Sequence, residues 1–281
     1  MNFMNFPKMI FGSLLMASLF TACNNAPKQE STAPVADSTA AMKEETITFT
    51  TDSANLHAFI VYNDSLKGKR PAVLVIPEWW GLNDYAKMRA RELARLGYVG
   101  MAIDLYGDGK VADNPDSAKA YATPFYLHPD KAKTRIDSAI AKIRTYDIVD
   151  GTKIGGIGYC FGGGMLINTA RLGDDLKGIV SFHGTLLGTP ARKDLLRTRM
   201  LICHGNDDKF VLPKEVAAFK KQMDSIGANY TFIGYDSATH AFTNPASTEN
   251  GKKYNMPIAY NVKADSASWD AMKNFFADLF K

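Results

Sequence analysis

Cysteine is scarce in this chain, and the few that occur are not spaced as metal ligands or as a disulfide framework. The 281 residues include three cysteines, none in a C-x-x-C pair, and no two of the five histidines lie three to five residues apart. Disulfide scaffolds need many cysteines in a short chain, and zinc sites use closely spaced Cys and His ligands. We therefore expect neither a disulfide scaffold nor a metal.

Concentrated positive charge is also missing. The net charge is +4, with no dense run of Lys or Arg and no interleaving of basic and aromatic residues, so nucleic acid is not an expected partner. The composition, 46% hydrophobic and 22% charged, is ordinary for a soluble globular protein. The length suffices for one large α/β domain with a substantial core.

The N-terminal apolar run, residues 9–20, is too short to span a bilayer as a stable helix. It follows Lys8 and precedes Thr-Ala-Cys23, which resembles the lipobox of bacterial lipoproteins, although Phe20 stands where Leu is usual. The resemblance implies that Cys23 is lipidated and becomes the mature N-terminus. We predict a lipoprotein-type signal peptide at 1–22 and an exported, membrane-anchored protein that faces the periplasm or the outer surface. An ordinary secretory signal cut near Ala22 is the alternative.

Aromatic residues are absent from the next stretch. Residues 24–45 consist largely of Asn, Ala, Pro, Ser, Thr, Lys and Glu, which cannot bury enough apolar surface to fold. We predict a flexible tether at 23–45, reaching roughly 25 Å, and a single domain at 46–281.

Strands and helices alternate along the domain. Residues 47–50 and 56–62 alternate as an antiparallel hairpin. The further predicted strands are 71–77, 98–105, 153–157, 176–182, 199–204 and 230–235, and the predicted helices are 83–96, 130–146, 165–172, 213–226 and 264–280. Residues 107–129 look rich in loops, with room for one short helix. This order predicts an α/β fold with a mostly parallel central sheet, helices on both faces and an N-terminal antiparallel hairpin.

The chain is organised around residues 152–165, which read T-K-I-G-G-I-G-Y-C-F-G-G-G-M. A strand, the pattern G-x-C-x-G and a helix follow one another, as in a nucleophile elbow with Cys160 in place of serine. The helix N-terminus would favour a thiolate at this position. A glycine-rich turn with an incidental cysteine is the alternative interpretation.

A cysteine nucleophile needs a base and an acid that orients the base. In α/β-hydrolases these follow the nucleophile in the order acid, then histidine. Only His240, after the last predicted strand, leaves room for an acid in between. Asp207 and Asp208 both follow the preceding strand, and order alone does not separate them. Glu78, at the end of a central strand among apolar residues, is a further candidate because burial perturbs the pKa of such carboxylates.

Taken together, these residues resemble the dienelactone hydrolases of the α/β-hydrolase superfamily over roughly residues 46–281. The matching stretches are P-E-W-W-G, D-L-Y at 104–106, G-Y-C-F-G-G-G, H-G-N-D-D-K-F-V, T-H-A-F-T-N and A-Y-N at 259–261. The resemblance implies a triad of Cys160, Asp208 and His240, with Glu78 helping to form the thiolate. It also implies an oxyanion hole made by the backbone N–H groups of Trp79 and Phe161.

One departure concerns the substrate. Dienelactone-cleaving members hold the substrate carboxylate with two arginines, where this chain has Asp108 and Asn244. We place both residues in the substrate pocket, with Trp80 and Tyr159 as aromatic walls, and expect a neutral substrate.

The resemblance implies a hydrolase that cleaves an ester or lactone through a thioacyl intermediate, without metal or organic cofactor. An acyltransferase on the same triad and a non-catalytic binding lipoprotein on a hydrolase scaffold are the alternatives. Oligomeric state is not predicted.

Overall fold

A computed structural model describes residues 41–51 and 54–281. The predicted signal peptide, Cys23 and most of the predicted tether lie outside the described residues. Within the described part of the chain, no helix is both long and apolar enough to cross a membrane.

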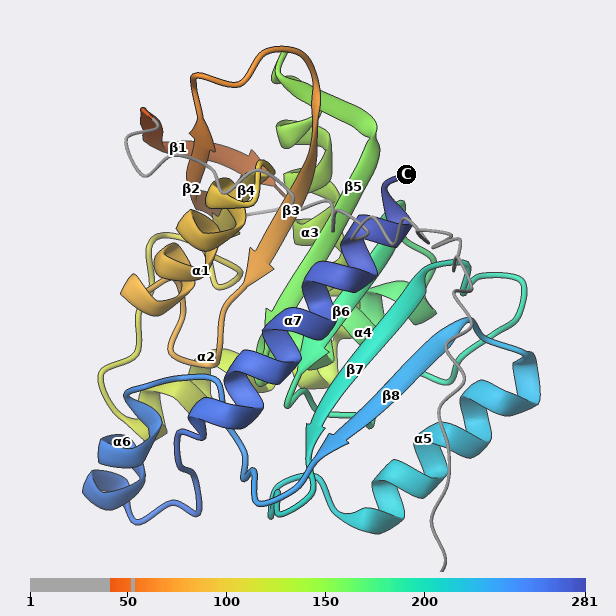
Figure 1. Cartoon of the computed structure of the whole chain (residues 1–281). Coiled ribbons are helices and arrows are strands. Elements are labelled where there is room, and N and C mark those ends of the chain that lie inside the picture. Colours follow the sequence, from red (N-terminus) through yellow and green to blue (C-terminus); the bar gives the residue numbers. More distant parts are fainter. Residues whose placement is uncertain (1–40, 52–53) are drawn as a thin grey trace, which may run out of the picture. The chain divides into compact units, whose positions relative to one another are not determined.

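One eight-stranded sheet forms the centre of the domain (Figure 1). Its strands are β1 (Met42–Thr51), β2 (Ala54–Asn63), β3 (Arg70–Ile76), β4 (Val99–Ile103), β5 (Val149–Tyr159), β6 (Gly178–Phe182), β7 (Arg199–Gly205) and β8 (Tyr230–Tyr235). They lie in the order β1-β2-β4-β3-β5-β6-β7-β8, with β1–β2 and β2–β4 antiparallel and all later pairs parallel. The predicted α/β fold with its antiparallel hairpin is confirmed.

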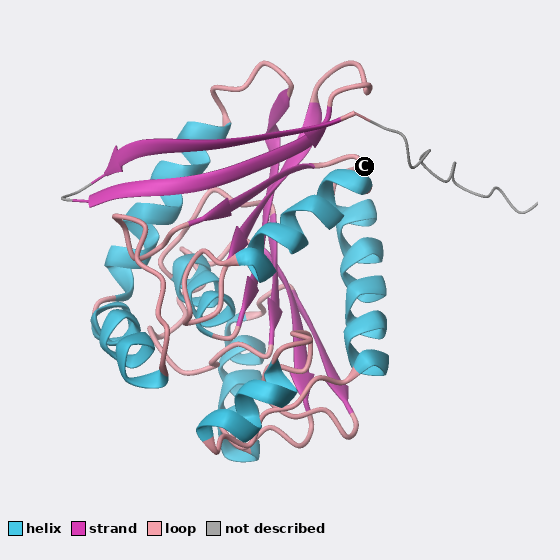
Figure 2. Cartoon of the chain, turned by 90° about the vertical axis from the view of Figure 1, so that its left-hand side faces the viewer, coloured by secondary structure: helices cyan, strands magenta, loops and turns pink. Residues whose placement is uncertain are grey.

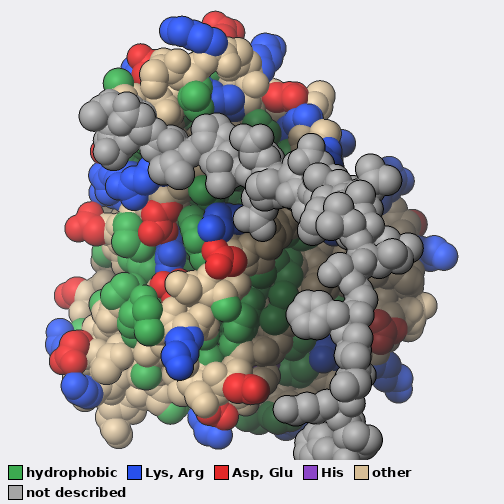
Figure 3. Space-filling model, viewed as in Figure 1, with side chains coloured by type: hydrophobic (Ala, Val, Ile, Leu, Met, Phe, Trp, Pro, Cys, Tyr) green, Lys and Arg blue, Asp and Glu red, His purple; other side chains and the backbone are tan. Residues whose placement is uncertain are grey.

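Helices cover both faces of this sheet (Figure 2). They are α1 (Asp84–Arg95), α2 (Pro115–Leu127), α3 (Pro129–Ile143), α4 (Phe161–Arg171), α5 (Pro213–Ile226), α6 (Ser247–Tyr254) and α7 (Val262–Leu279). Residues of α1 and α7 pack into one hydrophobic core, and residues of α2, α3, α4 and α5 pack into the other. On the face with α1 and α7, acidic and basic side chains are interspersed (Figure 3).

Strand β3 shows why the sheet is buried on both sides. Successive side chains of a strand point to opposite faces, so Leu74 and Ile76 join one core while Val73 and Val75 join the other, all with no exposed surface. A strand covered on both faces reads as a continuous apolar run rather than an alternating one. The proline-bounded run at 71–77 follows this rule.

The structure contains two helices to which the sequence pattern gave no residue bounds. The supposedly loop-rich region contains α2, a helix of 13 residues that begins with Pro115 and is capped by Asn114, which exchanges hydrogen bonds with Ser117. Only three α2 side chains are buried, Ala118, Ala122 and Phe125, so its apolar periodicity is weak. The short helix α6 was not predicted. Strand β1 starts at Met42, four residues before the predicted domain start, because Met42 pairs with Asn63.

Candidate active site

The predicted elbow is a tight turn between β5 and α4. Cys160 follows the last residue of β5, precedes the first residue of α4 and has φ 51° and ψ −114°. Such backbone angles cost a non-glycine residue of order 1–3 kcal/mol. A Cβ atom at Gly162 would lie 2.3 Å from the carbonyl oxygen of Ile76, so glycine is required where α4 approaches β3. The turn leaves Cys160 partly exposed at the start of the helix.

The structure brings Cys160, His240 and Asp208 together from three separate loops. Nε2 of His240 lies 3.0 Å from Sγ of Cys160, and Nδ1 of His240 lies 2.8 Å from Oδ2 of Asp208. The other carboxylate oxygen, Oδ1 of Asp208, accepts the backbone N–H groups of Phe210 at 2.7 Å and Val211 at 3.1 Å. Because a carboxylate only accepts, Nδ1 of His240 carries a proton and Nε2 faces the thiol. Asp207 does not take this place.

The electrostatics of His240 and Asp208 favour a positive imidazole ring and a negative carboxylate. Burial alone would lower the pKa of His240, but the negative charge of the Cys160 thiolate and the hydrogen bonds to Asp208 and Cys160 raise it well above its usual value. Burial opposes ionisation of Asp208, yet the hydrogen bond and charge of His240 and two backbone N–H groups lower its pKa. The arrangement can therefore hold a positive charge on His240 beside the carboxylate of Asp208.

The two backbone N–H groups predicted to form the oxyanion hole belong to Phe161 and Trp79. Phe161 is the first residue of α4, so its N–H has no acceptor within the helix. Trp79 follows Glu78 beyond β3 and lines the same cavity as Cys160, while its carbonyl oxygen accepts the Tyr106 hydroxyl at 2.9 Å. Among the described residues, the structure gives neither N–H a protein acceptor.

Glu78 is buried in the wall of this cavity. Its side chain is 3% exposed, and burial raises its pKa to about 7, against the opposing effect of the Asn244 hydrogen bond. The Nδ2 group of Asn244 donates to Oε2 of Glu78 at 2.6 Å, so the partner of the carboxyl group is this amide rather than the thiol. Asn244 is in turn fixed by the N–H of Ala246, which donates to its Oδ1 at 2.9 Å.

A cavity of about 350 Å³ opens beside Cys160 and His240. Its walls are largely apolar, and among the described residues that line it Lys119 is the one Lys or Arg. The larger apolar side chains that line it are Trp79, Trp80, Tyr126, Phe210, Val211, Met256 and Ile258. The predicted pocket residues Trp80 and Asn244 are among the lining residues.

Two predicted pocket residues lie elsewhere. Tyr159 is the last residue of β5 and points to the face of α1 and α7, where its ring stacks on Phe182 at 4.8 Å. Asp108 lies in a turn between two glycines, all three with positive φ, and its N–H donates to the carbonyl oxygen of Asn55 in the hairpin. Placing Tyr159 and Asp108 in the pocket was wrong, because nearness in sequence to a site residue does not set side-chain direction.

Several lining residues escaped the sequence analysis. Lys119 and Tyr126 come from α2, and Asn250 and Met256 come from α6 and the loop after it. None belongs to a motif, α2 has weak apolar periodicity, and α6 is only eight residues long, so the sequence gave no other signal.

Comparison with known proteins shows the family. Residues 56–280 match the family model described as Dienelactone hydrolase family. A relative from Aquifex aeolicus (strain VF5), named as a carboxymethylenebutenolidase, is 26% identical over 75% of this chain and 89% of its own length. A solved structure called m3DLH is 33% identical with a TM-score of 0.81, covering 86% of this chain and 100% of that one.

A second solved structure is described as the dienelactone hydrolase-like promiscuous phosphotriesterase P91 from metagenomic libraries. It is 32% identical with a TM-score of 0.79, and the match covers 85% of this chain and 99% of that chain. With its fold, its family match and these relatives, the chain belongs to the dienelactone hydrolase family of carboxylic-ester hydrolases.

Proposed function

We propose that this protein hydrolyses small neutral esters or lactones, with Cys160 as nucleophile, His240 as base and Asp208 as the acid that orients His240. The observation that carries the proposal is the continuous chain of contacts from Asp208 through His240 to the thiol, at 2.8 and 3.0 Å. A nucleophile, a base and an orienting acid within hydrogen-bond reach are the signature of covalent acyl transfer.

The reaction follows from this geometry. The Cys160 thiolate adds to the carbonyl carbon, and the π electrons move to oxygen, where the N–H groups of Phe161 and Trp79 stabilise the oxyanion. As the tetrahedral intermediate collapses, the C–O bond breaks and His240 gives its proton to the departing alkoxide. His240 then takes a proton from water, which attacks the thioester, and collapse releases the carboxylic acid and restores the thiol.

Glu78 supports the ionisation of Cys160 in this proposal. With a pKa of about 7, its carboxyl group exchanges a proton near neutral pH, and it lies in the wall of the cavity that contains the thiol. The Asn244 amide engages Oε2 alone, so acceptance of the thiol proton by Oε1 does not require this hydrogen bond to break.

Neutral phosphotriesters are a second candidate substrate class. The cavity has apolar walls with a single Lys, and a solved structure at 32% identity is described as a promiscuous phosphotriesterase. Thiolate attack on phosphorus would need the same nucleophile and the same N–H donors.

The test is a substrate panel with the domain from residue 41 onward. It contains neutral p-nitrophenyl esters of short acids, simple lactones and diethyl p-nitrophenyl phosphate, each also assayed with added alcohol to detect acyl transfer. We expect hydrolysis of the esters or lactones, and a loss of at least ~10³ in kcat/KM for Cys160→Ala and for His240→Ala. No turnover by the wild-type protein, or equal turnover by Cys160→Ala, would reject the proposal. If the ester formed by acyl transfer to the added alcohol outweighs the free acid, the acyltransferase is favoured.

We also propose that Cys23 is the lipidated N-terminal residue of the mature protein. The support is the apolar run at 9–20 followed by Thr-Ala-Cys. The wild-type protein should partition with membranes and incorporate labelled fatty acid, whereas Cys23→Ser should do neither. Recovery of the wild-type protein as a soluble form that is cleaved near Ala22 and carries no lipid would contradict the anchor.

A further inference from the structure

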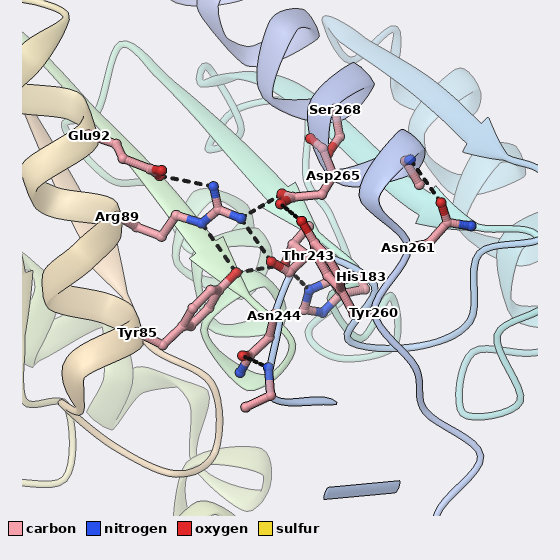
Figure 4. A network of polar contacts seen from close by, with 12 residues as sticks. Tyr85, Arg89, Glu92, His183, Thr243, Asn244, Tyr260, Asn261, Asp265 and Ser268 are labelled. Carbon is pink, nitrogen blue, oxygen red and sulfur yellow. Dashed lines mark hydrogen bonds and ion pairs between the residues drawn. The ribbon is translucent and has the colours of Figure 1, made fainter. Parts of the chain in front are cut away.

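A chain of buried polar contacts that includes none of the triad's hydrogen bonds leads away from the backbone of Cys160. Figure 4 shows its part from His183 through Thr243 to Tyr85 and Arg89. The chain of contacts starts at the backbone N–H of Cys160, passes through the ring of His183 to the hydroxyl group of Thr243, and continues to Tyr85 and Arg89. His183 and Thr243 have no exposed surface, and Arg89 is 4% exposed. Buried polar groups in such a chain are costly unless all are satisfied.

The contacts of His183 determine its tautomer. The N–H of Cys160 is shared between the carbonyl oxygen of Phe182 at 3.0 Å and Nδ1 of His183 at 3.1 Å. An N–H group can only donate, so Nδ1 must offer its lone pair and the ring proton must sit on Nε2. Nε2 lies 2.8 Å from Oγ1 of Thr243 and therefore donates to it.

Thr243 is held at both its hydroxyl and its carbonyl group. Its Oγ1 lies 2.7 Å from the Tyr85 hydroxyl, and its carbonyl oxygen accepts from Nη2 of Arg89 at 2.8 Å. Arg89 is fixed in turn by Asp265 at 2.5 Å and Glu92 at 2.9 Å. Because Thr243 lies three residues after His240, the same anchor also holds the loop of the base.

His183 is kept neutral by its surroundings. Burial, and then the positive charges of His240 and Arg89, lower its pKa well below the usual value. Its ring meets that of His240 edge to face at 5.3 Å, so two positive rings would repel one another there. A proton on Nδ1 would also point at the N–H of Cys160, setting two donors against each other.

We infer that His183 is a positioning residue: its neutral ring accepts the N–H of Cys160 and holds the strained elbow so that the thiol faces His240. The inference rests on the proposed role of Cys160. The left-handed φ of 51° at Cys160 persists only if neighbouring contacts fix it. Without the acceptor, Cys160 would relax toward ordinary angles, which moves both Sγ and the adjoining N–H of Phe161.

Three substitutions separate this role from simple packing. His183→Phe keeps an aromatic ring of similar volume but removes the acceptor, whereas His183→Asn is smaller but places its Oδ1 where Nδ1 now lies. We expect kcat to fall at least about thirtyfold in His183→Phe with KM changed less than about threefold, and to fall no more than about fivefold in His183→Asn. His57→Phe, on β2, is the matched control. A packing role predicts the reverse order, so equal or better turnover by His183→Phe would overturn the inference.

A second pair covers the case in which His183→Phe does not fold. Thr243→Val removes the hydroxyl group that accepts the Nε2 proton of His183 and so anchors the ring, and Thr243→Ser restores this acceptor. We expect kcat to fall about tenfold in Thr243→Val and to recover in Thr243→Ser, and equal values for the two would contradict the inference.

The rate of alkylation of Cys160 by iodoacetamide, measured by peptide mass spectrometry, is a readout independent of ester turnover. It should follow the same order as kcat, with His183→Asn faster than His183→Phe. If the wild-type protein hydrolyses no ester but this order holds, the proposed function fails and the positioning role stands. If esters are hydrolysed but the two variants are alkylated equally fast, the positioning role fails alone.

Discussion

Glu78 is the titratable side chain in the cavity wall whose protonation most directly links the site to stability. Burial raises its pKa from 4.5 to about 7, while the amide of Asn244 is its hydrogen-bond donor. Because the folded protein binds this proton more tightly than the unfolded chain, the stabilisation is fully present below pH 4.5. It is lost as the pH rises through about 7.

The substitution Glu78→Gln tests this linkage. Glutamine cannot ionise, so the variant does not lose stability as Glu78 does in the wild-type protein. The free energy of unfolding of the variant minus that of the wild type should therefore increase between pH 4.5 and pH 8, by up to about 3 kcal/mol. Denaturant unfolding of both proteins at several pH values measures the difference. A difference that stays constant with pH would show that Glu78 titrates normally in the folded protein.

Residue-level reasoning from the sequence worked where a short motif follows a strand. Cys160, Asp208 and His240 each sit just beyond a strand that could be read from its apolar run, so parallel strands alone place them at one edge of the sheet. His183 also follows a strand, but only the fold brings the ring of His183 to the N–H of Cys160 and to Thr243. The wrong placement of Tyr159 has a different cause, because the elbow turns the chain between two neighbouring residues.

At the level of elements, the close approach of α4 to the ends of β3 and β5 creates the elbow. A Cβ atom at Gly162 would meet two backbone carbonyl oxygens, of Ile76 at 2.3 Å and Pro77 at 2.5 Å, and backbone atoms cannot easily move aside. The N–H of Gly162 also donates to the carbonyl oxygen of Pro77 at 3.1 Å, which joins helix and strand end. Sequence alone suggests a tight turn here but not which carbonyl groups require it.

Gly162→Ala should therefore destabilise the protein by about 3 kcal/mol or more, through overpacking. Gly227→Ala is the matched control, because Gly227 ends α5 with a left-handed φ of 65° but has open space around it. The control should cost about 1 kcal/mol. Chemical denaturation gives both values, and equal costs would mean that the elbow can widen without penalty.

Helices α2 and α6 contribute walls of the cavity, but their sequences did not indicate which residues line it. Helix α2 has weak hydrophobic periodicity, and α6 is a short helix whose buried residues, Ser247 and Gly251, are not large apolar ones. Their lining residues, such as Tyr126 and Asn250, are recognisable only once the fold has placed them beside the elbow. The sheet and the meeting of Cys160, His240 and Asp208 could be predicted because burial and turn chemistry leave a strong local pattern, whereas the cavity walls leave none.

At the scale of the whole molecule, charge in the cavity decides which substrates fit. Arg89 is occupied by Asp265, Glu92 and the carbonyl oxygen of Thr243, so it offers nothing to a ligand. Lys119 is the one Lys or Arg among the described lining residues, and Asn244 lies where the dienelactone-cleaving relatives were expected to carry an arginine. A carboxylate entering this cavity would meet apolar walls and the buried Glu78.

We therefore predict that a neutral short-chain ester is turned over at least about tenfold faster, in kcat/KM, than its matched analogue with a carboxylate. A factor of ten corresponds to about 1.4 kcal/mol, the order expected for one missing ion contact. Lys119→Gln should widen this ratio by removing the remaining cation. Faster turnover of the anionic analogue would show that the cavity recognises a negative charge after all.

The central claim is that Cys160 forms a covalent acyl intermediate. Mass spectrometry of the acid-quenched protein, followed by peptide mapping, tests this claim most directly. The protein is mixed with a neutral p-nitrophenyl ester, quenched in acid within the first turnover and digested for peptide mapping. The account predicts a burst of one p-nitrophenolate per chain and one acyl group on the peptide that contains Cys160, both absent in Cys160→Ala. Acylation at another residue, or full turnover by Cys160→Ala without any adduct, would contradict it.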